Sequence, residues 1–193
     1  MKILCIGDSN TYGYNSVDGS RFENPWPSLL DAKVTNAGVN GKTLMKHPSE
    51  KVYPCSLNGL SNYFDSIYDL IIICLGSNDL KPNYLTSPKA YYRQYNQLIE
   101  AILANNPLQD ILLLGLPNIG PAFYQKENKI SSLAKSLETE IEKVAVNNHL
   151  NYLKLPQLEL TSDGIHLSEN AHHVLADFIN EYLNEKYKNN QIF

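Results

Sequence analysis

Short, uninterrupted apolar runs recur along this chain and are separated by longer segments of mixed polarity. Within each run the apolar residues do not alternate regularly with polar ones, which is typical of strands buried on both faces of a parallel sheet. The runs that fit this description are Lys2–Ile6, Lys33–Asn36, Leu70–Leu75, Ile111–Leu116 and Tyr152–Leu155, with Lys33–Asn36 the weakest. We therefore predict a sheet of five parallel strands.

The segments between these runs place apolar residues at helical spacing. Long helices are predicted over Pro88–Asn105, Ser131–Asn148 and Ser168–Tyr187, and short ones over Pro25–Leu30 and Leu57–Phe64. For the last long helix, the predicted packing residues are Val174, Leu175, Phe178, Ile179 and Tyr182. Strands that alternate with helices predict right-handed crossovers and an open, doubly wound α/β sheet. The sequence shows no repeat or linker, so residues 1–193 are expected to form a single domain.

Three polar or glycine-containing segments follow predicted strands, and this placement predicts where a ligand would bind. In doubly wound sheets, ligands bind outside the carboxyl ends of the strands. Ser9, Gly38–Gly41 and Gly76–Asp79 each follow a strand, so all three should meet at that edge. The longest irregular stretches, Asn15–Pro27 and Lys42–Ser56, are candidate walls of the pocket.

Composition and charge exclude several classes of protein. Hydrophobic residues make up 43% of the 193 residues, charged residues make up 19%, and the formal net charge is −4. A nucleic-acid-binding surface needs a basic stripe and an anionic membrane needs a polybasic run, and neither is found. No apolar run approaches the roughly 18 residues of a membrane helix. Because the first strand begins at Lys2, no signal peptide is expected and the cytoplasm is the expected location.

The cysteines add little to this picture. Cys5, Cys55 and Cys74 show no Cys-x-x-Cys spacing. Cys5 and Cys74 lie inside predicted strands, where a cysteine acts as a small buried apolar residue.

The candidate chemistry begins at Ser9, directly after the first strand. A serine hydroxyl is a weak nucleophile until a base removes its proton, and a carboxylate improves that base by orienting it. Asp163 and His166, three residues apart near the last helix, supply both residue types. Taken alone, Ser9 could belong to a turn begun by Asp8, Asp163 could be a turn residue, and His166 could be a half-buried loop histidine.

Two further segments could stabilise a developing negative charge. Gly76-Ser77-Asn78-Asp79 follows the most apolar strand, and the amide of Asn78 can point at an oxyanion, although such a segment is also a common polar turn. Glycines between Asn36 and Thr43 can present a backbone N–H without steric hindrance, and they lack the Walker spacing of a phosphate-binding loop.

Together and in this order, these segments resemble the four sequence blocks of the SGNH hydrolase superfamily, also called the GDSL esterase/lipase family. The resemblance implies Ser9 as nucleophile, His166 as base and Asp163 as its carboxylate. It also implies that the Ser9 and Gly41 N–H groups and the Asn78 amide form an oxyanion hole, with Gly38 as the less favoured glycine. The implied fold is a flavodoxin-like, three-layer α/β/α sandwich, and neither a cofactor nor a metal is implied.

The resemblance is closer to the arylesterase, acyltransferase and perhydrolase branch. The segments that support this are Gly7–Tyr14, Leu57–Gly59, Asp69–Lys81 and Asp163–His166. Members of this branch hydrolyse small esters and can transfer the acyl group to acceptors other than water, and a homo-oligomer is implied. Asn10 departs from the family pattern, which has leucine at this position, and we expect it to alter the polarity of the pocket.

We expect several other residues to support the site or the fold without taking part in the chemistry. Asp8 is expected to brace the turn at Ser9, and Asp79 to stand behind Asn78 without contacting substrate. Trp26 is interpreted either as a wall of the acyl pocket or as an anchoring aromatic residue. His172 and His173, with Glu169, are expected on a helix surface in preference to a metal site.

The predicted function is a cofactor-free serine esterase that hydrolyses small acetyl or short-chain acyl esters through an acyl-enzyme. Carbohydrate acetylesterase, thioesterase and lysophospholipase activities use the same kind of site and stay open. The alternative is a non-catalytic, flavodoxin-like module whose strand-end loops bind a nucleotide or flavin. The expected partner is a small ester, with no nucleic acid and no stable membrane association.

Overall fold

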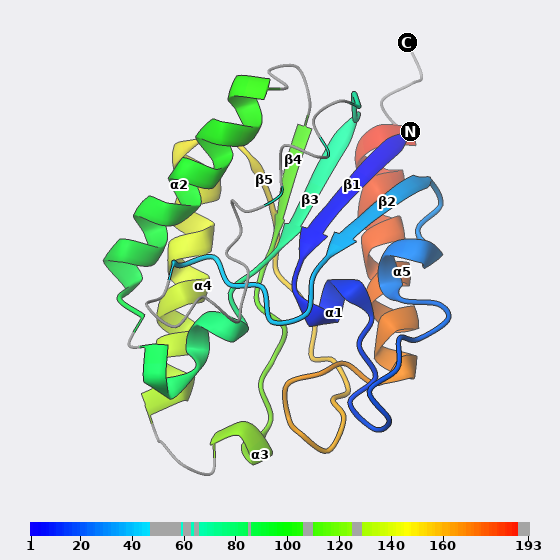
Figure 1. Cartoon of the computed structure of the whole chain (residues 1–193). Helices are drawn as coiled ribbons and strands as arrows, with labels where there is room; N and C mark the ends of the chain where they lie inside the picture. Colours follow the sequence, from blue (N-terminus) through cyan, green and yellow to red (C-terminus); the bar gives the residue numbers. More distant parts are fainter. Residues whose placement is uncertain are drawn as a thin grey trace.

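Five parallel strands form one sheet in the order β2-β1-β3-β4-β5 (Figure 1). This computed structural model describes residues 1–46, 59, 63, 66–84, 86–105, 110–124 and 129–188. The strands are β1 (Lys2–Gly7), β2 (Lys33–Gly38), β3 (Leu70–Cys74), β4 (Asp110–Leu114) and β5 (Asn151–Leu153). All five predicted strands are confirmed, with ends shifted by one or two residues.

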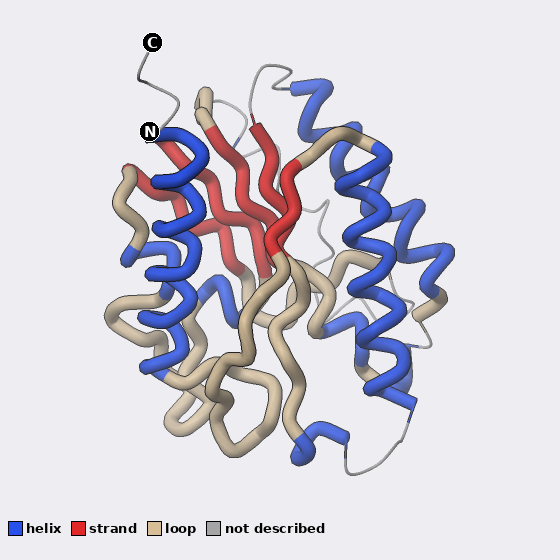
Figure 2. The backbone as a smooth tube through the Cα atoms, turned by 180° about the vertical axis from the view of Figure 1, so that it is seen from behind, coloured by secondary structure: helices blue, strands red, loops and turns tan. Residues whose placement is uncertain are grey.

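Helices cover both faces of the sheet, which gives the expected three-layer sandwich. Figure 1 shows α2 (Pro88–Asn105) and α4 (Lys129–Asn147) on one face and α5 (Glu169–Leu183) on the other, and Figure 2 shows the same layers from behind. Leu4 and Ile6 belong to the core cluster under α2 and α4, whereas Ile3 and Cys5 belong to the cluster under α5. Successive side chains point to opposite faces of a strand, so a strand covered on both faces needs apolar residues at every position.

The predicted helices are confirmed with small changes at their ends. The predicted range of α2 is the observed one, and α4 begins two residues earlier than predicted. Ser168 caps α5 because its hydroxyl oxygen accepts the Ala171 N–H at 3.1 Å. The last residues of the predicted helix lie in a π-helical turn, Asn184–Lys188.

Two expectations about α5 were wrong, and both errors have one cause. Val174 is 43% exposed, whereas His172 is fully buried. The buried stripe of α5 includes Leu175, Ala176 and Ile179, which are three, four and seven residues after position 172. This spacing puts His172 on the buried face and Val174 off it.

Short elements lie at the carboxyl ends of the strands, shown at the bottom of Figure 1. They are α1 (Ser9–Tyr12) after β1, the 3-10 helices η3 (Asn78–Leu80) and η4 (Pro82–Tyr84) after β3, and α3 (Pro121–Tyr124) after β4. The predicted helix at 25–30 is the 3-10 helix η1 (Trp26–Leu29), and most of the predicted helix at 57–64, like Cys55, lies outside the described residues.

The strands end level with one another, which brings the segments after them together. Gly7 at the end of β1 is in register with Gly38 of β2 and with Cys74 of β3. Segments that begin at Asp8, Val39 and Leu75 therefore start side by side. Among the described residues, no helix has the length and hydropathy needed to span a membrane.

Candidate active site

Ser9 lies in the turn where β1 passes directly into α1. Asp8 caps the helix, because its carboxylate Oδ1 accepts the Asn10 N–H at 2.9 Å. The helix ends after one turn at Gly13, which has a φ of 91° and donates its N–H to the carbonyl of Ser9. The turn is tightly packed, since a Cβ atom at Gly7 would lie 1.9 Å from the Thr11 hydroxyl oxygen.

The hydroxyl of Ser9 meets an imidazole and a carboxylate from the loop before α5. His166 Nε2 lies 2.9 Å from Ser9 Oγ, and His166 Nδ1 lies 2.6 Å from Asp163 Oδ2. The structure therefore brings together, as a hydrogen-bonded chain, three predicted residues that come from opposite ends of the sequence.

Asp163 is held in its ionised form. Burial raises the pKa of its carboxyl, but hydrogen bonds from the His166 backbone and ring and from the Ile165 N–H outweigh burial and hold this pKa well below its usual 3.8. Asp163 Oδ1 accepts the backbone N–H of His166 at 3.0 Å and the backbone N–H of Ile165 at 2.9 Å. An ionised carboxylate accepts the N–H at Nδ1, which leaves Nε2 able to take a proton from Ser9.

Asn10 does not act as the sequence led us to expect. Its side chain is only 2% exposed. The amide Nδ2 donates to the Ile165 carbonyl at 3.1 Å, and Oδ1 accepts the Leu167 N–H at 3.0 Å. Since the amide is bonded to main chain at both ends, the predicted change in pocket polarity is replaced by a structural connection to the loop that carries His166.

Gly41 and Asn78, the candidate oxyanion donors, lie next to each other. Asn78 Nδ2 donates one hydrogen to the Lys42 carbonyl at 3.1 Å. Gly41 has a φ of 75°, in the left-handed region that favours glycine. Gly38, the other glycine considered, donates its N–H to the Asn36 side chain at 2.9 Å, which favours Gly41 as the donor.

Asp79 fixes the loop that carries Gly41. Its two carboxylate oxygens accept the N–H groups of Leu44 and Met45, each at 2.8 Å. The side chain is fully buried. This placement fits the expectation that Asp79 stands behind Asn78.

Asp8 is buried beside the serine. Burial raises the pKa of its carboxyl to about 6, although the Asn10 N–H, the charge of His166 and the Ser77 hydroxyl each lower it. Its observed contact is the cap on α1, so it braces the turn in which Ser9 lies.

The sequence model of a known family covers this whole site. Residues 5–174 match the GDSL-like Lipase/Acylhydrolase family. The chain belongs to this family. Family membership confirms the resemblance drawn from the four sequence segments and supports a hydrolase.

Solved structures share the fold of this GDSL-like chain. A carbohydrate acetylesterase from Sinorhizobium meliloti has a TM-score of 0.83 at 20% identity, covering 96% of this chain and 99% of that one. The inhibitor-bound aryl esterase of M. smegmatis has a TM-score of 0.81 at 21% identity, covering 95% and 98%. A lipase/acylhydrolase from Enterococcus faecalis has a TM-score of 0.71 at 20% identity, covering 96% of both chains. Among curated proteins, none matches the chain.

The residues just after α1 contact the GDSL-like site, Tyr14 directly and Ser16 through Thr161. The Tyr14 ring lies 4.9 Å from the His166 ring, centroid to centroid, at an angle of 56°. The Ser16 hydroxyl donates to Thr161 Oγ1 at 2.7 Å, and that hydroxyl in turn donates to Asp163 Oδ1 at 3.0 Å. Sequence analysis named Tyr14 only within the segment Gly7–Tyr14 and Ser16 only within the candidate pocket wall Asn15–Pro27, and it missed Thr161, because nothing in the local pattern marks these contacts.

Trp26 anchors the chain and does not form a wall of the pocket. Its side chain is 1% exposed and belongs to the core cluster under α5. Its backbone N–H donates to His172 Nδ1 at 3.3 Å. The anchoring interpretation of Trp26 is therefore the one that the structure supports.

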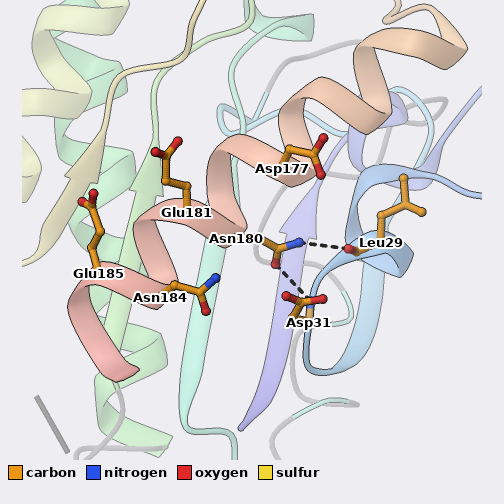
Figure 3. A pocket seen from close by; sticks show the side chains of 7 residues that line it. All are labelled: Leu29, Asp31, Asp177, Asn180, Glu181, Asn184 and Glu185. Atoms are coloured by element: carbon orange, nitrogen blue, oxygen red, sulfur yellow. Dashed lines mark hydrogen bonds between the residues drawn. The ribbon is translucent and has the colours of Figure 1, made fainter. Parts of the chain in front are cut away.

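A hollow lined by carboxylates lies beside α5 at the opposite end of the sheet. It is formed by Leu29, Asp31, Asp177, Asn180, Glu181, Asn184 and Glu185 (Figure 3). Asp31 comes just before β2, so this hollow lies at the amino ends of the strands and away from Ser9. Within the described ranges, no group of three His, Cys, Asp or Glu residues is arranged as metal ligands would be.

Proposed function

We propose that this chain is a serine esterase that hydrolyses small carboxylic esters, of acetyl or other short acyl groups, through an acyl-enzyme. The observation that carries the proposal is the hydrogen-bonded chain from Ser9 Oγ through His166 to Asp163. Membership of an acylhydrolase family agrees with it. The non-catalytic binding module gives no reason for a serine, a histidine and an ionised carboxylate to be aligned in this way.

Acylation begins when Ser9 Oγ attacks the ester carbonyl carbon. His166 Nε2 takes the hydroxyl proton as the new C–O bond forms, and Asp163 stabilises the resulting imidazolium. When the tetrahedral intermediate collapses, the bond to the alcohol oxygen breaks and His166 returns the proton to that oxygen. The alcohol leaves, and the acyl group stays on Ser9 as an ester.

Deacylation repeats these steps with water. His166 Nε2 removes a proton from the water molecule as its oxygen attacks the acyl carbon, and it then gives this proton to Ser9 Oγ as the acid leaves. The enzyme returns to its starting state with no cofactor consumed. An alcohol in place of water would complete an acyl transfer by the same route.

The negative charge on the substrate oxygen needs fixed donors. The Ser9 N–H, the Gly41 N–H and the Asn78 amide are proposed for this role. A primary amide has two N–H bonds, and only one of those on Asn78 is used by the Lys42 carbonyl. The second is proposed to donate to the oxyanion.

The substrate class is proposed from solved structures of the same fold. The Tyr14 ring contacts the imidazole, with the ring centroids 4.9 Å apart. Similar folds include a carbohydrate acetylesterase and an aryl esterase. A panel of p-nitrophenyl esters from acetate to octanoate, with acetylated xylose, an acyl thioester and a lysophospholipid, ranks these classes directly.

The decisive experiment compares wild type with Ser9→Ala. We expect wild type to hydrolyse p-nitrophenyl acetate and to be labelled by a fluorophosphonate at Ser9, and Ser9→Ala to lose both properties. Ser132→Ala is the control, because Ser132 is exposed and its hydroxyl donates to the Lys129 carbonyl of the same helix, α4. Equal turnover by wild type and Ser9→Ala would refute the esterase, and a flavin released from the purified protein would favour the binding module.

A further inference from the structure

The side chain of Asn10 bonds to the main chain on both sides of His166. It donates to the carbonyl of Ile165 and accepts the N–H of Leu167, the residues immediately before and after the histidine. Asn10 itself follows Ser9 directly. One buried amide thus connects the segment that carries the hydroxyl to the segment that carries the imidazole.

The loop that carries the imidazole is held together by hydrogen bonds within the loop. Thr161 donates its N–H to the His166 carbonyl at 2.8 Å, and Gly164 donates its N–H to the Thr161 carbonyl at 3.0 Å. Asp163 accepts two backbone N–H groups and one ring nitrogen from the same loop. These bonds orient the imidazole within its loop, but they cannot fix the distance between that loop and Ser9.

That distance depends on bonds between the loop and its neighbours. Ser16 reaches Thr161, and the Gly120 N–H donates to the Gly164 carbonyl at 2.7 Å, both at positions before His166. The two bonds from Asn10 are the ones that flank His166 itself. They join it to the first turn of α1, where Ser9 lies.

We propose that Asn10 is a positioning residue that sets the separation between Ser9 Oγ and His166 Nε2. This inference rests on the proposed function, because the separation matters only if His166 takes a proton from Ser9. A leucine at this position, as in the family pattern, would leave the Ile165 carbonyl and the Leu167 N–H without their partner. In this chain the loop would then relax away from Ser9.

The expected effect follows from the sensitivity of proton transfer to geometry. A displacement of about 1 Å can cost on the order of 100-fold in rate. We expect Asn10→Leu to lower kcat for p-nitrophenyl acetate by roughly 10- to 100-fold, with KM changed less than about threefold. The rate of fluorophosphonate labelling at Ser9 should fall by a similar factor.

Acyl chain length separates this role from that of a pocket wall. A wall residue changes the preference among acyl groups, so its substitution would affect acetate and octanoate esters by different factors. A residue that positions His166 acts on every ester equally. We therefore expect the same loss of kcat across the panel from acetate to octanoate.

The chain offers a matched control in α5. Asn180 Nδ2 donates to the Leu29 carbonyl at 3.1 Å, and its Oδ1 accepts the Asp31 N–H at 2.9 Å (Figure 3). Asn180 therefore bonds like Asn10: its amide donates to the carbonyl of one residue and accepts the N–H of the residue two positions later. It does so at the other end of the sheet from Ser9. Asn180→Leu should leave kcat and the labelling rate unchanged.

The experiment measures kcat, KM and labelling rate for wild type, Asn10→Leu and Asn180→Leu, with thermal unfolding to confirm that each is folded. If Asn10→Leu does not fold, Asn10→Ser replaces it, because a serine hydroxyl is too short to bond both groups. An unchanged kcat, a loss that depends on acyl length, or an equal loss in Asn180→Leu would overturn the inference. If Ser9→Ala hydrolyses p-nitrophenyl acetate as fast as wild type, it is the proposed function that fails.

Discussion

Acidification should destabilise this protein through His172, a buried histidine that the proposed mechanism does not use. Its Nδ1 accepts the Trp26 N–H, so the ring is neutral with its hydrogen on Nε2. Among the described residues, Nε2 has no hydrogen-bond partner. Burial, aided by the charge of His173, lowers the pKa of His172 from 6.5 to about 4. A protonated ring would lose the bond from Trp26 and place a charge in the core.

The size of the effect follows from the two pKa values. In the unfolded chain His172 protonates near pH 6.5, whereas in the folded chain it stays neutral until about pH 4. The neutral histidine therefore contributes stability that is complete above pH 6.5 and is lost progressively as the pH falls from 6.5 to about 4. Linkage gives a loss of about 2 kcal/mol by pH 5 and about 3 kcal/mol by pH 4.

The assay is urea unfolding at pH 7.5, 5 and 4, followed by the fluorescence of Trp26, the single tryptophan. His172→Asn is the test variant, because its Oδ1 can accept the Trp26 N–H and it does not titrate. Its absolute stability will be lower because it leaves a cavity, so the comparison is the change in unfolding free energy with pH. That change should be about 2 kcal/mol smaller than in wild type between pH 7.5 and 5.

The neighbouring exposed histidine supplies the control for this experiment. His173→Asn lies on the same helix and should keep most of the pH dependence of wild type, because burial is the larger cause of the lowered pKa of His172. Equal loss of stability in wild type and His172→Asn between pH 7.5 and 5 would show that the histidine is not held neutral by burial, and the reasoning would fail.

Two further predictions concern the loops around Ser9. Asn78→Ala should lower kcat for p-nitrophenyl acetate by about 10²- to 10³-fold, because it removes a proposed oxyanion donor; a kcat within threefold of wild type would contradict that role. Gly38→Ala should destabilise the fold by roughly 1–3 kcal/mol in thermal unfolding, since its Cβ would lie 2.2 Å from the Tyr12 nitrogen. Gly19→Ala is a control for crowding, because among the described residues the nearest atom to its Cβ would be the Tyr14 hydroxyl at 4.0 Å. Gly38→Ala should therefore destabilise the fold more than Gly19→Ala, despite the positive φ of Gly19.

Most of the fold could be predicted because a covered parallel sheet leaves a strong sequence signal. Strands such as Leu70–Cys74 are apolar at every position, since one face packs under α2 and α4 and the other under α5. The edge strands give a weaker signal. Neither β2 nor β5 is fully covered, as their half-buried residues show, so polar residues such as Asn36 and Asn151 occur within them.

The errors in α5 show where pattern alone fails. Val174 was assigned to the core because it is apolar, and His172 to the surface because it is polar. The buried residues Leu175, Ala176 and Ile179 define which face of the helix packs on the sheet. His172 lies on that face and Val174 does not. A histidine can occupy a core position when one ring nitrogen finds a backbone partner, here the Trp26 N–H from a segment 146 residues away.

The site residues could be proposed from sequence because Ser9, Gly41 and Asn78 come after strands and the Asp163–His166 pair comes just before a helix, but the residues that hold them in place could not. Two proposed functional residues, Ser9 and Asn78, are each followed by a side chain that bonds the backbone of another loop. Asn10 holds the loop of His166, and Asp79 holds the loop after Gly41. These partners lie between 34 and 157 residues away, so no local pattern reveals them. In the sequence Asn10 and Asp79 look like ordinary polar turn residues, yet in the structure they are the links through which separate strand-end loops acquire a fixed geometry.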